Sequence, residues 1–196
     1  MPFNTVHFTD PYPTTTTHPY TSTVKHLVKA GVQLTKGQAV YVTGSTGNAG
    51  TNMIVGKASN DAEITSSKTM GLVETSASIN DQAYVITEGL LSGLNTNGAS
   101  AGDPVWLGTN GNLIYGLANK PHAPAHLVFI GIVTRAQQNN GEIFVRPQNG
   151  FEMSELHDLV LSGLAAGDII VWDGSKWTNS SISISSLDGG SASSFG

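Results

Sequence analysis

Short apolar runs alternate with polar turns between residues 24 and 150. The runs are rich in β-branched and aromatic residues, and the breaks between them are rich in Gly and Asn, which tolerate positive φ. This pattern predicts an all-β region of short strands, folded as a barrel or sandwich. The predicted strands are Val40–Val42, Met53–Val55, Met70–Val73, Ala83–Ile86, Val105–Leu107, Leu113–Tyr115, Leu127–Val133 and Glu142–Val145.

Glycine and asparagine clusters mark the turns. The segment Thr43–Gly50 is predicted to be a turn loop, and Asn110–Gly111 is predicted to close the clearest hairpin of the chain. Gly44–Thr51 also loosely resembles a phosphate-binding loop. It lacks the lysine and the spacing of that motif, so the turn interpretation is favoured.

One short signal recurs at a fixed interval. Gly37, Gly102 and Gly167 each begin a Gly-x-x-Val/Ile segment, and they are separated by 65 residues in both cases. Gly71-Leu-Val followed by Ala83-Tyr-Val also matches a second pair of segments, Gly131-Ile-Val followed by Ile143-Phe-Val, 60 residues later. Self-similarity of this kind predicts a duplicated β unit, here two related half-barrels or sandwich halves within residues 24–150.

Residues 1–23 differ from the region that follows. They combine prolines, threonines and aromatics, which favour extended backbone but cannot form a core of their own. One interpretation is a disordered tail. The interpretation preferred here is an extended arm that lies on a neighbouring subunit. Its aromatic anchors would be Phe3, Phe8, Tyr12 and Tyr20.

Residues 151–196 change character again. Phe151–Leu159 is predicted to be a short helix. Asp168–Trp172 and Trp177 are predicted to form a small hairpin around the turn Asp173–Lys176. A short strand is expected around Ile182 and Ile184, and a Gly/Ser-rich tail follows it.

Composition limits the function. Charged residues make up 12% of the chain, the net charge is −5 and the nine basic residues are scattered, which argues against nucleic acid as a partner. The absence of cysteine excludes disulfides, thiolate catalysis and Cys-based zinc sites. No apolar run approaches the roughly 20 residues of a membrane helix. No basic, apolar leader is seen, so assembly in a cytosol is expected.

The sequence evidence for a catalytic or metal-binding site is weak. His122 and His126 are four residues apart, but Pro121 and Pro124 oppose the helix that would place both on one face. His157-Asp158 has no nucleophile elbow to complete a triad. No catalytic residue, metal or cofactor is therefore expected, and the chain is predicted not to be an enzyme. Acidic pairs for glycoside hydrolysis stay open because their separation is spatial; the candidates are Glu63, Glu74, Asp81 and Glu88.

Trp106, Trp172 and Trp177 are candidate surface or interface aromatics. Tryptophan rings stack on sugars, although burial in a core or interface is the commoner fate of this residue.

Several segments together resemble a β-rich virion module of tailed bacteriophages, found especially in phages of cyanobacteria and other aquatic bacteria. The resemblance covers about residues 26–160. The segments that carry it are Lys36–Val42, Val85–Thr96, Ala101–Gly108, Gly131–Arg135 and Asn149–Asp158. Gly167–Trp177 separately resembles a hairpin that is common in fibre-like phage proteins.

The resemblance implies a non-enzymatic virion component, commonly trimeric, that binds the major capsid protein or tail proteins. The module occurs in capsid decoration (cement) proteins and near the front of tail fibres. Decoration is the expected role, because little sequence follows the Trp172 hairpin to form a receptor-binding region. Tail or fibre attachment is the alternative, and a carbohydrate-binding virion module is the third possibility.

Overall fold

The computed structural model describes residues 23–47 and 52–181. The chain divides into two compact units, Met1–Asn149 and Gly150–Gly196, which we call the body and the C-terminal unit. The aromatic arm residues Phe3, Phe8, Tyr12 and Tyr20 and the strand expected around Ile182 and Ile184 lie outside the described residues.

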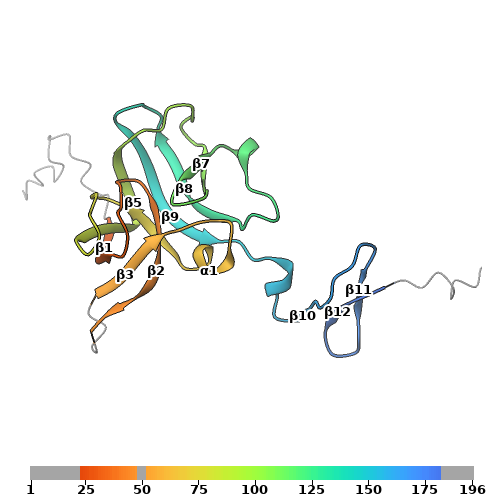
Figure 1. Ribbon diagram of the computed structural model, residues 1–196. Coiled ribbons are helices and arrows are strands. Elements are labelled where there is room, and N and C mark those ends of the chain that lie inside the picture. Colours follow the sequence, from red (N-terminus) through yellow and green to blue (C-terminus); the bar gives the residue numbers. More distant parts are fainter. Residues whose placement is uncertain (1–22, 48–51, 182–196) are drawn as a thin grey trace, which may run out of the picture. The chain divides into compact units, whose positions relative to one another are not determined.

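The described part of the chain is almost entirely β (Figure 1), as predicted. Each of the eight predicted strands lies within a strand of the structure, apart from the first residue of Leu127–Val133, and several observed strands are longer than predicted. The sequence pattern did not reveal β1. The strands of the body are β1 (Val24–Ala30), β2 (Ala39–Thr46), β3 (Asn52–Lys57), β4 (Thr69–Val73), β5 (Gln82–Leu94), β6 (Pro104–Leu107), β7 (Leu113–Tyr115), β8 (Val128–Arg135) and β9 (Gly141–Asn149). Two short helices, α1 (Glu63–Ser66) and η1 (Leu117–Asn119), lie in the connections, and none in the described residues is long and apolar enough to cross a membrane.

The first five strands close into a ring. β1 pairs in parallel with β3, and the antiparallel pairs β3–β2, β2–β4, β4–β5 and β5–β1 complete the circle. The ring encloses a small core of fully buried side chains. Its largest members are Val28, Leu34, Val40, Val55, Val73 and Val85.

The second set of strands repeats this order but stays open. The second half of β5 takes the place of β1: Leu90 pairs with Phe144, as Lys25 pairs with Ile86. The set continues through β9, β8 and β6 to β7. No ladder joins β7 back to β5 among the described residues. The predicted duplication of strand order is therefore present, whereas a second closed barrel is not seen, and the two sets share β5.

The sequence alignment of the two copies was wrong by two residues in one strand. Val73 pairs with Val85 in the first copy, and Val133 pairs with Ile143 in the second. The segment that matches Ile143-Phe-Val is thus Val85-Ile-Thr, not Ala83-Tyr-Val. The connection from β4 to β5 is two residues longer than the connection from β8 to β9. A shift of two residues preserves the alternation of inward and outward side chains along a strand, so the hydrophobic pattern alone did not reveal it.

The glycine signal marks one turn that occurs three times. The third residue of each turn is a glycine with positive φ, +86° at Gly37, +93° at Gly102 and +94° at Gly167. The backbone N–H of the fourth residue donates to the carbonyl of the first, and a side-chain oxygen of the fourth residue accepts from the N–H of the first. The turns are Thr35–Gln38, Ser100–Asp103 and Ala165–Asp168.

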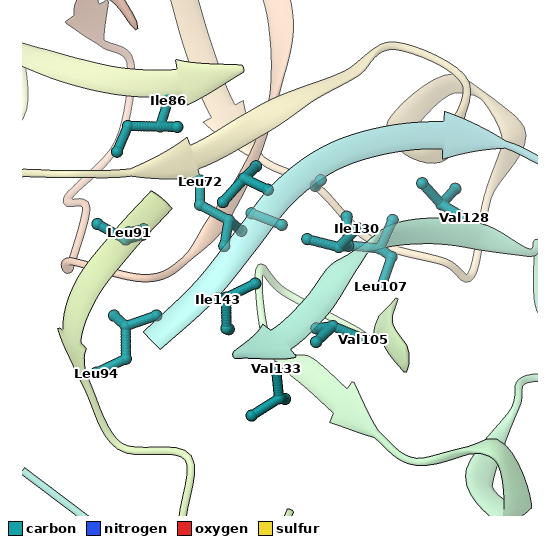
Figure 2. Packing of buried hydrophobic residues seen from close by; sticks show 13 residues of the cluster. Leu72, Ile86, Leu91, Leu94, Val105, Leu107, Val128, Ile130, Val133 and Ile143 are labelled. Atoms are coloured by element: carbon teal, nitrogen blue, oxygen red, sulfur yellow. The ribbon is translucent and has the colours of Figure 1, made fainter. Parts of the chain in front are cut away.

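A larger core lies between the two sets of strands. Figure 2 shows Leu72 and Ile86 of the first set beside Leu91, Ile130 and Ile143 of the second. These side chains are at most 2% exposed. The continuous core explains why the body behaves as one unit instead of two.

Two further predictions need correction. Strand β2 runs on to Thr46 with an irregularity near Gly44, so most of the predicted turn loop Thr43–Gly50 that is described is strand. The predicted helix Phe151–Leu159 is only a single 3₁₀ turn, η2 (Met153–Glu155). Leu156 is already extended, with ψ of 133°, because the chain there enters a strand pair.

The predicted hairpin of the C-terminal unit is confirmed. It consists of β11 (Ile169–Trp172) and β12 (Trp177–Ser180), and β10 (Leu159–Val160) pairs in parallel with β12. The carboxylate of Asp173 closes the turn by accepting the backbone N–H groups of Ser175 and Lys176.

Candidate interaction surface

Exposed apolar side chains concentrate on the C-terminal unit. Its most exposed members are Phe151, which is 82% exposed, and Leu164, which is 64% exposed. Leu159 is the one buried hydrophobic residue among the described residues of this unit. The other exposed hydrophobic residues of the unit are Met153, Leu156, Val160, Ile169, Ile170, Trp172 and Trp177.

Strand geometry explains why so little is buried. The described residues of the unit form one sheet of three short strands in the order β10-β12-β11, too few to enclose a core. Successive residues of a strand face opposite sides, and Ile169, Ile170 and Trp172 are all exposed, so both faces of β11 are apolar. A surface of this kind, rather than a cavity, is the feature of the chain best suited to binding another protein.

The two exposed tryptophans form a pair. Trp172 lies directly opposite Trp177 in the β11–β12 ladder, with ring centroids 5.6 Å apart and an angle of 64° between the ring planes. An edge-to-face pair holds both indoles in a fixed position on one face of the sheet. The pair is preorganised for contact with a partner.

The carboxylates of this unit serve its turns. Asp168 accepts from the side-chain amide of Asn179 and the N–H of Ala165, and these bonds lower its pKa. Asp173 accepts from Lys176 and Ser175, which lowers its pKa as well. Because both carboxylates are occupied in local structure, they are not candidates for acid or base catalysis.

Trp106 is not a surface aromatic, and that part of the prediction is wrong. It is 8% exposed; its indole N–H donates to the Gly116 carbonyl at 3.1 Å, and its ring packs edge-on against Phe129. Lys120 lies over the ring, 5.8 Å from its centroid. Stacking of a sugar on Trp106 would require these contacts to break.

Two of the acidic candidates are held in ion pairs. Glu63 pairs with Nδ1 of His126 at 3.0 Å, and Glu74 pairs with Lys25 at 3.0 Å. No group of three or more metal-ligating side chains occurs within residues 23–47 and 52–181. Asp81 and Glu88 are exposed on β5 or just before it, in agreement with a solvated position.

Comparisons with known proteins give a distant likeness among solved structures. No known family and none of the curated proteins matches the chain. Among solved structures, it is similar to the crystal structure of the head fiber gp8.5 N base of bacteriophage phi29, with 10% identity and a TM-score of 0.42. The match covers 67% of this chain and 99% of that chain.

Two open grooves lie on the body. One, of about 410 Å³, lies between Lys36–Gln38 and Leu113. The other, of about 420 Å³, is lined by Tyr41, Thr43 and Lys57 among others. Neither groove is lined by an aspartate, glutamate or histidine.

One buried charged group, Glu142, was not predicted from the sequence. Glu142 is 8% exposed in β9, where its carboxylate accepts from Ser92, Thr134 and Arg135. Burial raises its pKa, but the hydrogen bonds and the guanidinium charge outweigh this and leave the pKa below its ordinary value. In the sequence, Glu142 is a glutamate at the start of an apolar strand. A glutamate in that position is equally typical of a strand end exposed to solvent, so the sequence did not indicate that it is buried. Its partners come from two other strands, so the network is structural.

Proposed function

We propose that the chain is a structural protein of a phage virion, and that it decorates the outer surface of the capsid as a cement protein. The observation that carries the proposal is the unequal burial of the two units. The body has complete cores, whereas the described residues of the C-terminal unit expose nine large apolar side chains, as expected of a chain that is completed by assembly with other proteins and with further copies of itself. The resemblance of residues 26–160 to phage virion modules supports the same role.

Decoration would stabilise a shell through buried area. Each apolar contact with a capsid protein would contribute roughly 25 cal/mol of binding free energy per Å² of apolar surface removed from water, before the entropic cost of ordering the contact is subtracted. Many copies on a lattice would add small contributions together, and this role needs neither a cofactor nor a catalytic residue. We propose the major capsid protein as the partner, a homo-oligomer of the trimeric kind as the binding form, and assembly in the host cytoplasm.

The copy number of the chain in purified virions tests this proposal. We expect a ratio to the major capsid protein that matches the symmetry of the shell lattice, measured by quantitative mass spectrometry of intact particles. A count that is only a small multiple of the symmetry of the tail would contradict decoration and favour the alternative, a tail or fibre attachment protein. Absence from the virion would reject both.

The arm hypothesis makes a separate prediction. Deleting residues 1–23 is expected to abolish capsid binding while the body still folds, because the ring of strands begins at Val24. The measurement is cosedimentation with capsids, with circular dichroism to verify folding. A matched control keeps the full length and changes the four aromatics Phe3, Phe8, Tyr12 and Tyr20 to serine. Normal binding by both variants would show that the arm is not the anchor.

A carbohydrate-binding virion module is a second candidate, favoured by the exposed pair of Trp172 and Trp177. Exposed indoles on a rigid hairpin are suited to stacking against sugar rings. Binding to soluble glycans that is lost when both tryptophans are replaced would favour this candidate over decoration.

A further inference from the structure

The C-terminal unit is a partial third copy of the strand set in the body. β10 pairs in parallel with β12, as β1 pairs in parallel with β3. The paired residues of β10, Leu159 and Val160, lie 130 residues, or twice 65, after the paired residues of β1, Lys29 and Ala30. The glycine turn before β11 is the same turn that precedes β2 and β6. Strands β10, β11 and β12 therefore correspond to β1, β2 and β3.

This third copy lacks the neighbour that the other two have. In the body, β2 pairs with β4 and β6 pairs with β8, on the side away from the hairpin partner. The turn glycines take part: the N–H of Gly37 donates to Val73, and the N–H of Gly102 donates to Val133. In the C-terminal unit, β11 is the edge of the sheet, and no strand takes the place of β4 or β8 among the described residues.

Burial at equivalent positions shows the consequence. Val40 and Val105 are fully buried, whereas Ile170, the residue at the same place after the third turn, is 42% exposed. Leu34 is fully buried one residue before the first turn, whereas Leu164 is 64% exposed one residue before the third. Positions that form the core in the body are thus uncovered in the C-terminal unit.

We propose that a second copy of this chain covers these positions, so that copies associate through their C-terminal units. The area supports this partner. A large aromatic side chain buries about 150–250 Å², so the exposed parts of Phe151, Trp172 and Trp177 alone present on the order of 350 Å². The six remaining exposed aliphatic residues enlarge this apolar surface, which lies on both faces of the sheet, so one contact with a second copy covers a part of it.

The edge of β11 is also suited to pairing with its own copy. It carries neither proline nor lysine between Ile169 and Trp172, the residues that usually protect an edge. Two β11 strands related by a twofold axis run antiparallel, the same orientation as β2 against β4 and β6 against β8. Identical surfaces that meet in this way close on themselves instead of forming an open fibre.

The net charge of the C-terminal unit predicts how the association depends on salt. Residues 150–181 contain five acidic side chains and a single lysine, Lys176. Two copies therefore repel each other weakly, and salt screens this repulsion while leaving apolar contacts intact. Association between copies is expected to strengthen as salt is raised. Docking on a basic surface of a different protein would weaken instead.

The test is the mass of the full chain in solution, measured by light scattering across a range of concentration and salt. We expect a multiple of the 20.4 kDa of one chain, with more oligomer at higher salt. Replacing Trp172 by serine and Ile170 by asparagine together is expected to raise the dissociation constant at least about 10-fold. The matched control replaces Ile79 by serine, because Ile79 is 58% exposed on the body. A wild-type monomer at every concentration, or a Trp172/Ile170 variant that associates normally, would overturn the proposal.

Tryptophan fluorescence supplies a readout that does not depend on the variants folding. Trp172 and Trp177 would pass from water into an interface. The fluorescence emission of the wild-type chain is therefore expected to shift to shorter wavelength as the protein concentration rises. An unchanged spectrum in an associated sample would place the interface elsewhere and overturn the inference. The inference rests on self-association as part of the proposed function, and it names a twofold contact between two copies that is separate from the threefold contacts of the proposed trimer. A monomer in solution would defeat the inference without changing the copy number in the virion, which tests the proposed function separately.

Discussion

Replacing Gly71 or Gly131 by alanine is expected to destabilise the body by at least about 3 kcal/mol, enough to unfold a domain of ordinary stability. A β-carbon on Gly71 would lie 2.0 Å from the carbonyl oxygen of Ile86, and one on Gly131 would lie 2.0 Å from that of Phe144. Both obstacles are backbone atoms in paired strands, which cannot rotate away as a side chain can. Relief would require the strands to separate.

Gly44 supplies the matched control. It also lies in a strand of the body, but a β-carbon there would meet nothing within 4 Å. Urea denaturation followed by the fluorescence of the buried Trp106 measures all three variants. We expect the Gly44→Ala protein to unfold within about 1 kcal/mol of wild type. If the Gly71→Ala or Gly131→Ala protein were as stable as this control, the neighbouring strand could not lie as close to these glycines as the structure shows.

The two glycines also show what the sequence could reveal about the fold. Their correspondence was visible as a repeated Gly-apolar-Val segment, because both copies need the same close approach at the same place. Turns were predictable for a similar reason, since positive φ at a residue such as Gly102 is a local requirement. Long-range pairing was not. The two-residue difference in alignment and the pairing of β1 with both β3 and β5 depend on contacts distant in sequence.

The candidate surface was harder to predict than the strands. Leu107 and Trp172 each lie five residues after the glycine of the same turn, Gly102 and Gly167, and so occupy the same place on their strands. Leu107 is fully buried in β6, which pairs with β8, whereas Trp172 is 52% exposed in β11, which has no such neighbour among the described residues. The decisive difference lies in a strand that is present in one case and missing in the other. No property of the tryptophan or its immediate neighbours encodes it.

Replacing Glu142 by leucine is the second substitution expected to have a large effect, about 3 kcal/mol or more at neutral pH. The carboxylate joins three strands, because it pairs across the sheet with Ser92 on β5 and with Arg135 on β8. The bond from Arg135 is 2.9 Å long, and so is the one from the Thr134 hydroxyl. Leucine would leave these donors without their acceptor. Glutamine, which keeps the shape and one acceptor oxygen, is expected to cost about 1–2 kcal/mol.

The control for Glu142 is Glu88→Gln. Glu88 is an exposed carboxylate on β5, so its replacement removes the same charge without breaking a buried network. The free energy of unfolding, from urea titrations, is expected to change by less than about 0.5 kcal/mol in this variant. A loss as large as that of Glu142→Gln would show that net charge, and not the network, is responsible.

The pH dependence of the Glu142 variants separates the ionised network from simple packing. The pKa of Glu142 is lower in the folded protein than in an unfolded chain, where it is about 4.3. The unfolded state therefore binds a proton first as pH falls, and the stability from the ionised carboxylate is present above about pH 4.3 and is lost as pH falls through the folded pKa. The difference in stability between wild type and Glu142→Gln is thus expected to be constant near neutrality and to shrink in acid. A difference that stayed constant down to pH 2 would mean that glutamine fails for steric reasons, and that the charge of Glu142 does not hold β5, β8 and β9 together.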